Sequence, residues 1–459
     1  MSEPSAASSV LRRVLRLSVG TSVVQGLALV GQAVFALLLT PTDFGVWASA
    51  SAAVFVLAGL VNFGEVNGYL ASPAMTLAAT RKAIWRWNAV LVLLGLLVAA
   101  AYSRLGQSDI ALYIVLLAVN LPLLGETLLL SAACMKSNRG RLLVTSQTVA
   151  AVGRLVVGVG VAWLTHSPLA FALSMITYSL ALIVVLSLCD LSEPASLLDV
   201  AAVQRSRLAW GAQSLSQTLP TQADFFAISL TGRLALLGVY FLAYQATVAL
   251  SGLIVSSLSG ITLVELSKQD TLGRRSTAAT LLSAMTHTLG AVSCVLAGAL
   301  LLAGAALPDR WEVYAPTVVI LLASLPARIV TPLTDALQMS ESRWWRSSSL
   351  NVVDALGTAV AGLSAVSGSV IVVATCIAGW KLACSLLRLA VAFGGVRQVR
   401  GLRSAVPVVG YGAVLVIAGV TWSMWSALLL LAALSLSGYR LVARQGVARS
   451  DDLLAVGGA

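Results

Sequence analysis

Charged side chains are scarce in this sequence: only 10% of its 459 residues are Asp, Glu, Lys or Arg, whereas 58% are hydrophobic. A soluble domain carries about 25% charged residues, so this chain lacks the polar surface that a water-facing fold needs. The deficit extends along the whole length. It therefore predicts an all-α membrane protein with many spans rather than a soluble enzyme on one anchor.

Cysteine and histidine are also rare, with five and two residues. No two cysteines form a CxxC pair, and neither His166 nor His287 has metal-ligand spacing around it, so we expect no metal site. The sequence also lacks a nucleophile–base motif, a Walker loop and an HExxH motif. We therefore expect a protein that is not an enzyme and needs no cofactor.

The net charge of +11 comes from basic residues that lie in small groups between apolar runs, which argues against nucleic-acid binding. At about 20 residues per span, the runs number about fourteen, with twelve as the competing count. They lie near residues 17–39, 45–71, 87–103, 110–134, 142–164, 169–189, 208–231, 236–264, 277–305, 314–338, 348–367, 369–393, 405–422 and 424–441.

The basic groups alternate between loops. If the N-terminus is cytoplasmic, every second loop is basic, as at residues 136–141 and 397–403, and the opposite loops hold only three arginines. The preference for Arg over Lys is typical of a bacterium with a GC-rich genome. We therefore predict a bacterial inner-membrane protein with both termini in the cytoplasm. Tryptophans such as Trp47, Trp85 and Trp163 fall near span ends, where they are typical interfacial anchors.

An internal repeat links the two halves of the chain. The segment GVWASASAAVFVLAGLV (45–61) aligns without gaps to GVYFLAYQATVALSGLI (238–254). This alignment matches the second predicted span with the eighth, and both spans are predicted to cross the membrane in the same direction. The repeat predicts two parallel six-helix lobes. Their bounds, with those of the remaining parts, are 1–190 and 205–395 for the lobes, 404–442 for an extra helix pair and 443–459 for a cytoplasmic tail.

Prolines occur at related places in the two predicted lobes. Pro122 lies in the fourth span, Pro326 and Pro332 in its counterpart, the tenth, and Pro220 in the seventh. A proline inside a helix removes one backbone donor and kinks the helix. Each of the four is therefore either a packed kink or a hinge.

Two motifs carry a family resemblance. The segment LLTPTDFGVWASASA (38–52), followed by LVNFG (60–64), resembles polysaccharide-transport flippases of the Wzx type, and so does QADFFAISLTGRLALLGVYFLAYQA (222–246). These flippases belong to the multidrug/oligosaccharidyl-lipid/polysaccharide (MOP) exporter superfamily. The resemblance implies a MATE-like fold of two lobes and flipping of undecaprenyl-linked oligosaccharides by alternating access. We expect glycosyltransferases and a glycan polymerase as functional partners, and H⁺ or Na⁺ as the coupling ion.

Several ionisable residues fall inside predicted spans, where each costs roughly 2.5–3.5 kcal/mol on insertion scales. Glu126 and Arg154 lie at similar depths on adjacent spans, and Arg328 and Asp354 do so in the other lobe. We predict both couples to be buried ion pairs, which either hold each lobe together or take part in transport.

Asp224 is the candidate for ion coupling. It follows Pro220 by four residues in a span rich in amides and hydroxyls, where a carboxylate can hold a proton or Na⁺. The alternative is a satisfied polar contact between helices. We expect the substrate to be contacted by Lys381, Arg388, Arg154 and Glu65. The alternative for Arg388 is that its side chain extends to the cytoplasmic surface instead.

Two other functions compete with flipping. A multidrug or organic-cation antiporter of the same superfamily would explain the intramembrane acids. Acids and bases inside the spans nearly balance, which argues against a strongly anionic substrate. A membrane-embedded glycan polymerase or ligase would need a large outer loop, and no predicted outer loop is long enough. Flipping or export of a lipid-linked polysaccharide precursor therefore remains the preferred function, with the antiporter as its alternative.

Overall fold

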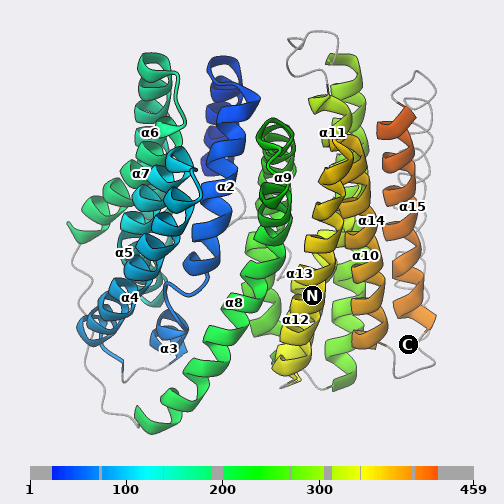
Figure 1. Ribbon diagram of the computed structural model, residues 1–459. Coiled ribbons are helices and arrows are strands. Elements are labelled where there is room, and N and C mark those ends of the chain that lie inside the picture. The colour runs from blue at the N-terminus through cyan, green and yellow to red at the C-terminus, as the bar shows by residue number, and fades with distance from the viewer. Residues whose placement is uncertain are drawn as a thin grey trace. The chain divides into compact units, whose positions relative to one another are not determined.

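The computed structural model describes residues 23–71, 75–137, 139–188, 200–267, 271–303, 313–341, 343–393 and 399–421. Within these ranges every regular element is a helix, which confirms the predicted all-α fold (Figure 1). The predicted last span at 424–441 and the tail at 443–459 lie outside the described residues.

The first half of the described chain holds nine helices. They are the Val23–Leu38 helix, α2 (Pro41–Ala58), α3 (Glu65–Ala71), α4 (Leu77–Arg104), α5 (Ser108–Lys136), α6 (Gly140–Thr165), α7 (Leu169–Ser187), α8 (Val200–Leu230) and α9 (Leu234–Ser267). The second half continues with further helices, namely α10 (Thr271–Ala303), α11 (Tyr314–Leu322), α12 (Leu325–Ser340), α13 (Trp344–Gly362), the 3₁₀ helix η3 (Leu363–Ser367), α14 (Val370–Phe393) and α15 (Val399–Thr421).

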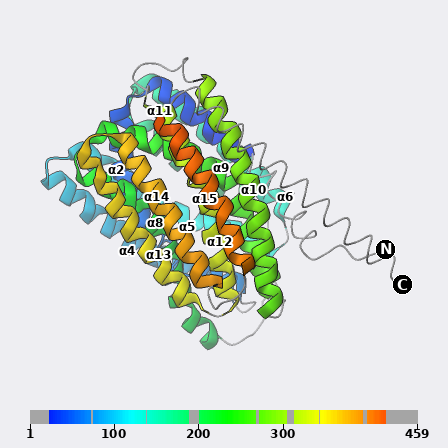
Figure 2. The ribbon, with the colours of Figure 1, turned by 90° about the vertical axis from the view of Figure 1, so that its right-hand side faces the viewer.

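The chain divides into two compact units. We call residues 12–257 together with 342–373 the N-terminal unit, and residues 258–341 together with 374–459 the C-terminal unit, which also takes in 1–11. Within the N-terminal unit, α4 packs on α5, α6 on α7, and α8 on α13. Within the C-terminal unit, α10 contacts α11, α12 and α15 (Figure 2). The predicted division into two six-helix lobes stays a prediction.

Among the described residues, nine helices are long and apolar enough to cross a membrane, and three shorter apolar helices accompany them. The helix α8 is not among these nine, although it has 31 residues, because its sequence is rich in Gln, Ser and Thr. Nine of the predicted apolar runs thus contain helices of membrane-spanning length in the described part of the chain, as predicted from about 20 residues per span.

The predicted second span is not one continuous helix. Its start is well defined, because Thr40 and Asp43 form a capping box: the Asp43 carboxylate accepts from the Thr40 backbone N–H at 2.9 Å and the Thr40 hydroxyl accepts from the Asp43 N–H at 3.3 Å. The chain then leaves the helix after Ala58 and resumes at Glu65. Phe63 and Gly64 have positive φ angles of 36° and 80°, which an α-helix does not accommodate.

The predicted tenth span is also interrupted. The helices α11 and α12 are separated by residues 323–324, and Pro326 stands in the first turn of α12, where a missing N–H costs nothing. Pro332 lies inside α12, Pro122 inside α5 and Pro220 inside α8, and these three helices continue past their prolines. Whether the prolines act as hinges stays a prediction.

Each unit has its own apolar packing. In the N-terminal unit a cluster of buried residues joins α3 to α7, with Tyr69, Ile84 and Leu129 fully buried. In the C-terminal unit Leu266, Ala278 and Leu337 bring the end of α9, α10 and α12 together. Long apolar side chains on α4 and α6 remain exposed, including Leu97 and Val156, as expected for lipid-facing surfaces.

Candidate functional site

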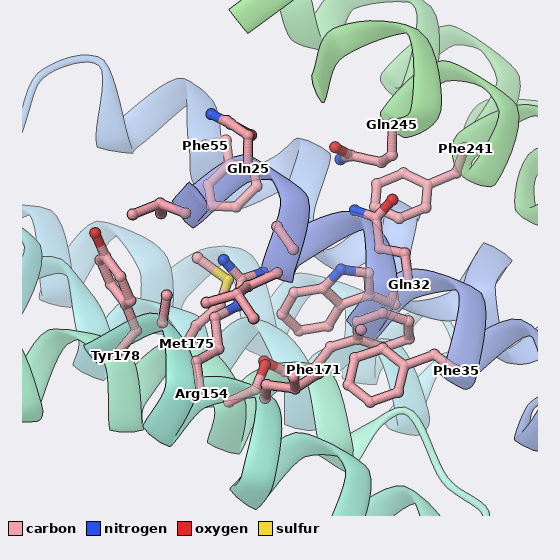
Figure 3. Close-up of a pocket in the computed structure, with 18 residues that line it drawn as sticks. Gln25, Gln32, Phe35, Phe55, Arg154, Phe171, Met175, Tyr178, Phe241 and Gln245 are labelled. Atoms are coloured by element: carbon pink, nitrogen blue, oxygen red, sulfur yellow. The ribbon is translucent and has the colours of Figure 1, made fainter. Parts of the chain in front are cut away.

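The N-terminal unit contains a cavity of about 310 Å³ between the Val23–Leu38 helix, α2, α6, α7 and α9 (Figure 3). We call it the Arg154 cavity. Arg154 stands 14 residues after the start of α6 and 11 before its end, so its Cα lies about 17–21 Å from either end of the helix. The cavity therefore lies beside the middle of a helix that is long and apolar enough to cross a membrane.

Small residues leave the space that the cavity occupies. Ala28 and Gly31 line it from the first helix, and Ala151 lines it one turn before Arg154 on α6. A turn after Arg154, Gly158 packs tightly on Phe35 and Ser174, so that α6 and α7 approach closely there. Along α6, Ala151 and Arg154 therefore border the cavity, whereas Gly158 is in close contact with its neighbours.

The electrostatics of the cavity are one-sided. Arg154 is the only Asp, Glu, Lys or Arg among the described residues that line it. In the described part of the chain, its guanidinium makes no hydrogen bond or ion pair, although the phenol of Tyr178 lies near enough to interact electrostatically. An unpaired charge at this depth is costly. A cation exposed to a cavity without a carboxylate is suited to binding an anion.

Polar amides and aromatic rings complete the lining. Gln25, Gln32 and Gln245 face the cavity, and the Gln32 Oε1 atom is buried without a hydrogen-bond partner among the described residues. At the other side from Arg154 in Figure 3, Phe35 and Phe171 pack edge to face, with centroids 4.7 Å apart. A cavity with one cation, several amides and apolar ring faces suits a polar ligand that carries a negative group.

Of the predicted substrate residues, the structure places only Arg154 in this cavity. The other lining residues were missed, and a weak signal existed for two of them. Gln25 and Gln32 are seven residues apart, two helical turns, so they lie on the same face of an otherwise apolar run. Trp47 was interpreted as an interfacial anchor. It is 3% exposed and stacks on Phe171, with centroids 5.2 Å apart.

Asp224 is fully buried in α8 and is not among the residues that line the Arg154 cavity. One carboxylate oxygen accepts a hydrogen bond from the Tyr240 hydroxyl of α9 at 2.5 Å, and the other accepts from the backbone N–H of Phe225 at 2.9 Å. On a third side, Gly362 of α13 packs against the Asp224 backbone. The Tyr240 hydroxyl and the Phe225 N–H thus hold the carboxylate in place. Pro220 is buried one turn before Asp224.

The polar run that precedes Asp224 forms a seam between α8 and α13. The Gln213 amide donates to the Ser347 hydroxyl at 2.9 Å and accepts from the Ser348 hydroxyl at 2.6 Å. Further along, the Asn351 amide donates to Ser216 at 3.4 Å. For Gln213 and Ser216 the structure thus supports the alternative in which the polar run forms hydrogen-bonded contacts between helices. Asp354, on the same α13, accepts from Thr358 at 3.3 Å.

Glu126 pairs with a different arginine from the one predicted. Arg81 Nε donates to one carboxylate oxygen at 2.7 Å, and the Trp85 indole N–H donates to the other at 3.0 Å. The predicted Glu126–Arg154 pair is therefore wrong. Matched depth was not sufficient, because Glu126 faces α4 while Arg154 faces the cavity beside α7.

Arg388 is committed to an ion pair inside the C-terminal unit. It is 0% exposed, and its Nη1 atom lies 3.1 Å from the Asp335 carboxylate of α12. Neither the predicted substrate contact nor extension to the cytoplasmic surface fits this burial. Lys381 lies two turns earlier on α14 and is half-buried. Between them, the Ser385 hydroxyl donates to the Ala327 carbonyl at 3.2 Å and joins α14 to α12.

The remaining predicted residues are dispersed. Glu65 is the first residue of the short helix α3, after the break in the second span, and is half-buried. Arg328, in the C-terminal unit, lies 3.4 Å from the Ser324 hydroxyl. Asp354 belongs to the N-terminal unit, so the Arg328–Asp354 pair stays a prediction.

Comparison with solved structures defines the fold class. A lipid II flippase MurJ in an inward closed conformation aligns with a TM-score of 0.66 at 9% identity, covering 93% of this chain and 99% of that one. An inward-facing multidrug resistance MATE family transporter of the MOP superfamily aligns with a TM-score of 0.59 at 10% identity, covering 87% and 99%. A MOP superfamily transporter from Pyrococcus furiosus gives 0.59 at 10% identity, covering 88% and 96%. The chain therefore has the fold of MOP-superfamily membrane transporters.

The sequence itself matches a family model described as polysaccharide biosynthesis protein, over residues 34–316. The chain belongs to this family. No curated protein matches it. Together, the family and the fold confirm the resemblance to polysaccharide-transport flippases of the MOP superfamily.

Proposed function

We propose that this protein moves lipid-linked oligosaccharide or polysaccharide precursors, such as undecaprenyl-linked ones, across the bacterial inner membrane by alternating access. The observation that carries the proposal is the Arg154 cavity, which a cation lines midway along α6 and in which none of the described lining residues is a carboxylate. Such a site favours a ligand with a carboxylate or phosphate group, as lipid-linked sugars have. Family membership supports the same substrate class.

The cavity is large enough for the polar end of a lipid-linked sugar. Its volume of about 310 Å³ lies at the lower end of the range of about 300–1,000 Å³ found for ligand pockets. We assign the anionic part of the substrate to this cavity, within hydrogen-bond reach of Arg154 and the glutamine amides.

The organic-cation antiporter is the alternative that the fold alone also permits, since MATE transporters share the fold. The cavity disfavours it. A cationic substrate would face Arg154, and Asp224, the acid assigned to ion coupling, is buried against Tyr240 and does not line the cavity. Charge at the binding site thus distinguishes the two functions.

The direct test uses purified protein in liposomes with two substrates. We expect transfer between leaflets of an undecaprenyl-pyrophosphate-linked fluorescent sugar and no uptake of a cationic dye. A neutral, phosphate-free glycolipid with the same fluorophore is the control for the role of the anion. Dye uptake without sugar-lipid transfer would overturn the proposal in favour of the antiporter.

Coupling to H⁺ or Na⁺ is assigned to Asp224. Replacing Asp224 with Asn keeps its size and an oxygen acceptor for Tyr240 but removes the charge. We expect Asp224→Asn to fold and to retain substrate binding while losing the response of transport to an imposed H⁺ or Na⁺ gradient. The matched control is Tyr240→Phe, which keeps the carboxylate. Gradient-driven transport at the wild-type rate in Asp224→Asn would remove Asp224 from the mechanism.

The orientation in the inner membrane follows from the alternating basic loops. Single cysteines at positions 139 and 343 are expected to react only with reagents that reach the cytoplasm, and one at position 166 only with an impermeant reagent added outside. Labelling of positions 139 and 166 from the same side would contradict this topology. Glycosyltransferases that build the substrate and a glycan polymerase that consumes it are the expected functional partners.

A further inference from the structure

Two glycines bring the backbones of α2 and α9 into direct contact. A Cβ atom added to Gly45 would overlap the carbonyl of Leu234, and one added to Gly238 would overlap the carbonyl of Pro41. Neither position has room for any side chain. Both glycines and both carbonyls belong to the N-terminal unit.

The contact has the symmetry of the internal repeat. Gly45 and Gly238 are the first residues of the two aligned segments, at the same repeat position. Each glycine meets the carbonyl of the residue four positions before the other one: Pro41 precedes Gly45 by four, and Leu234 precedes Gly238 by four. The first turns of α2 and α9 therefore cross about a local two-fold axis. An alignment of apolar sequence alone does not show that equivalent glycines touch.

This crossing borders the Arg154 cavity. Phe44, next to Gly45, is fully buried, with its ring centroid 5.0 Å from that of Phe171 and 6.5 Å from that of Phe241. Phe171 and Phe241 both line the cavity. The crossing and the Phe44 ring thus lie directly behind the aromatic wall, at the ends of α2 and α9 that the topology places outside the cytoplasm.

We propose that the Gly45–Gly238 crossing is the outer seal of the Arg154 cavity, and that α2 and α9 separate there when the cavity opens outward. This inference rests on the proposed function. Small residues allow helix backbones to pack closely inside a membrane by dispersion and Cα–H···O contacts. The two bare backbones exclude water at the crossing itself, and the Phe44–Phe241 ring contact behind it is the side-chain contact that has to separate with the helices.

The test measures access to the cavity from outside. In a background without the five native cysteines, Ser174→Cys places a thiol in the cavity wall, where Ser174 is 1% exposed. An impermeant maleimide is added to intact cells. We expect little labelling in this background and several-fold more when Gly45→Ala or Gly238→Ala holds the helices apart. Gly160→Ala is the matched control, because a Cβ there meets no atom within 4 Å.

Labelling equal to that of Gly160→Ala in both glycine variants, with normal expression and monodisperse elution, would overturn the seal. More labelling from the cytoplasmic side alone would overturn its outer position. The labelling measurement needs no substrate. If the proposed substrate class is wrong, the labelling result therefore stays the same, and only the proposed function is contradicted.

A second pair of variants decides the matter if the glycine variants do not fold. A short bifunctional maleimide is expected to link Phe44→Cys with Phe241→Cys across the crossing, and each single cysteine serves as control. The linked protein should lose transport in liposomes, because its outer seal cannot open. Failure to link, or transport that continues after linking, would overturn the proposal.

Discussion

Arg154 and Arg388 are two arginines inside membrane-spanning helices that meet opposite surroundings. Arg388, on α14 of the C-terminal unit, is 0% exposed and lies 3.1 Å from Asp335. Arg154, on α6 of the N-terminal unit, lines a cavity of 310 Å³ and has no ion-pair partner in the described part of the chain. From their positions inside predicted spans, both were expected to contact the substrate, and Arg154 also to pair with Glu126.

The difference teaches that an intramembrane charge does not by itself mark a binding site. A buried charge with its counter-charge is part of the packing, and removing one partner strands the other. A charge that borders a cavity destabilises the fold, and the rest of the packing offsets that cost. Such a charge is available to a ligand. The following predictions test this distinction, from the largest expected effect to the smallest.

The Arg388–Asp335 pair should control stability. Asp335→Ala leaves a fully buried guanidinium without its carboxylate, and we expect a loss of about 3–5 kcal/mol in unfolding free energy or failure to accumulate. Arg388→Met combined with Asp335→Leu should recover much of that loss, because no charge is stranded. Thermal unfolding in detergent measures both. A stable Asp335→Ala variant would mean that Arg388 is not buried as the structure shows.

Arg154 should control binding instead. Arg154→Gln removes a cation that has no ion-pair partner among the described residues, so stability should stay the same or rise. A hydrogen bond to a charged group contributes about 1.5–3 kcal/mol. Affinity for the lipid-linked sugar should therefore fall about ten- to one-hundred-fold. Arg154→Lys should lose less, since it keeps the charge but not the planar donor group. Binding by a tail-labelled lipid together with thermal unfolding separates the two effects. Unchanged affinity in Arg154→Gln would contradict the anion site.

The Glu126 site should show the smallest effect, and it tests which arginine is its partner. Arg81 is 42% exposed, so solvent screening limits this ion pair to about 1 kcal/mol or less. In double-mutant cycles of stability, Glu126→Ala should couple with Arg81→Ala and add independently to Arg154→Ala. Coupling to Arg154 alone would restore the pair predicted from depth.

Patterns with a local physical cause were predictable from the sequence. Apolar runs predicted the helices, and the Thr40–Asp43 spacing starts α2 through a capping box. The break between α2 and α3 was missed, because residues 45–71 were counted by apolar content, which outweighed the turn signal of Asn62 and Gly64. Gly64 adopts a left-handed φ of 80°, and the Asn62 side chain accepts from its N–H at 3.0 Å.

The partners of charged and polar side chains depended on the tertiary structure. In an α-helix each residue turns the side chain by about 100°, so depth along the axis leaves the facing neighbour undetermined. Glu126 consequently meets Arg81, and the Asp224 carboxylate meets Tyr240. The Arg154 cavity depends on five helices at once, which no spacing within one helix reports.

The sequence by itself determined that this chain is helical and membrane-embedded, which family it resembles, and which spans carry charge, because the bilayer imposes a length and an apolar composition on each span. Only the tertiary structure decided that Arg154 is open to a cavity while Arg388 is closed in an ion pair. The physical reason is that the energy of a charge in a membrane depends on what lies within a few ångströms of it. Helix rotation and packing between distant segments set that surrounding.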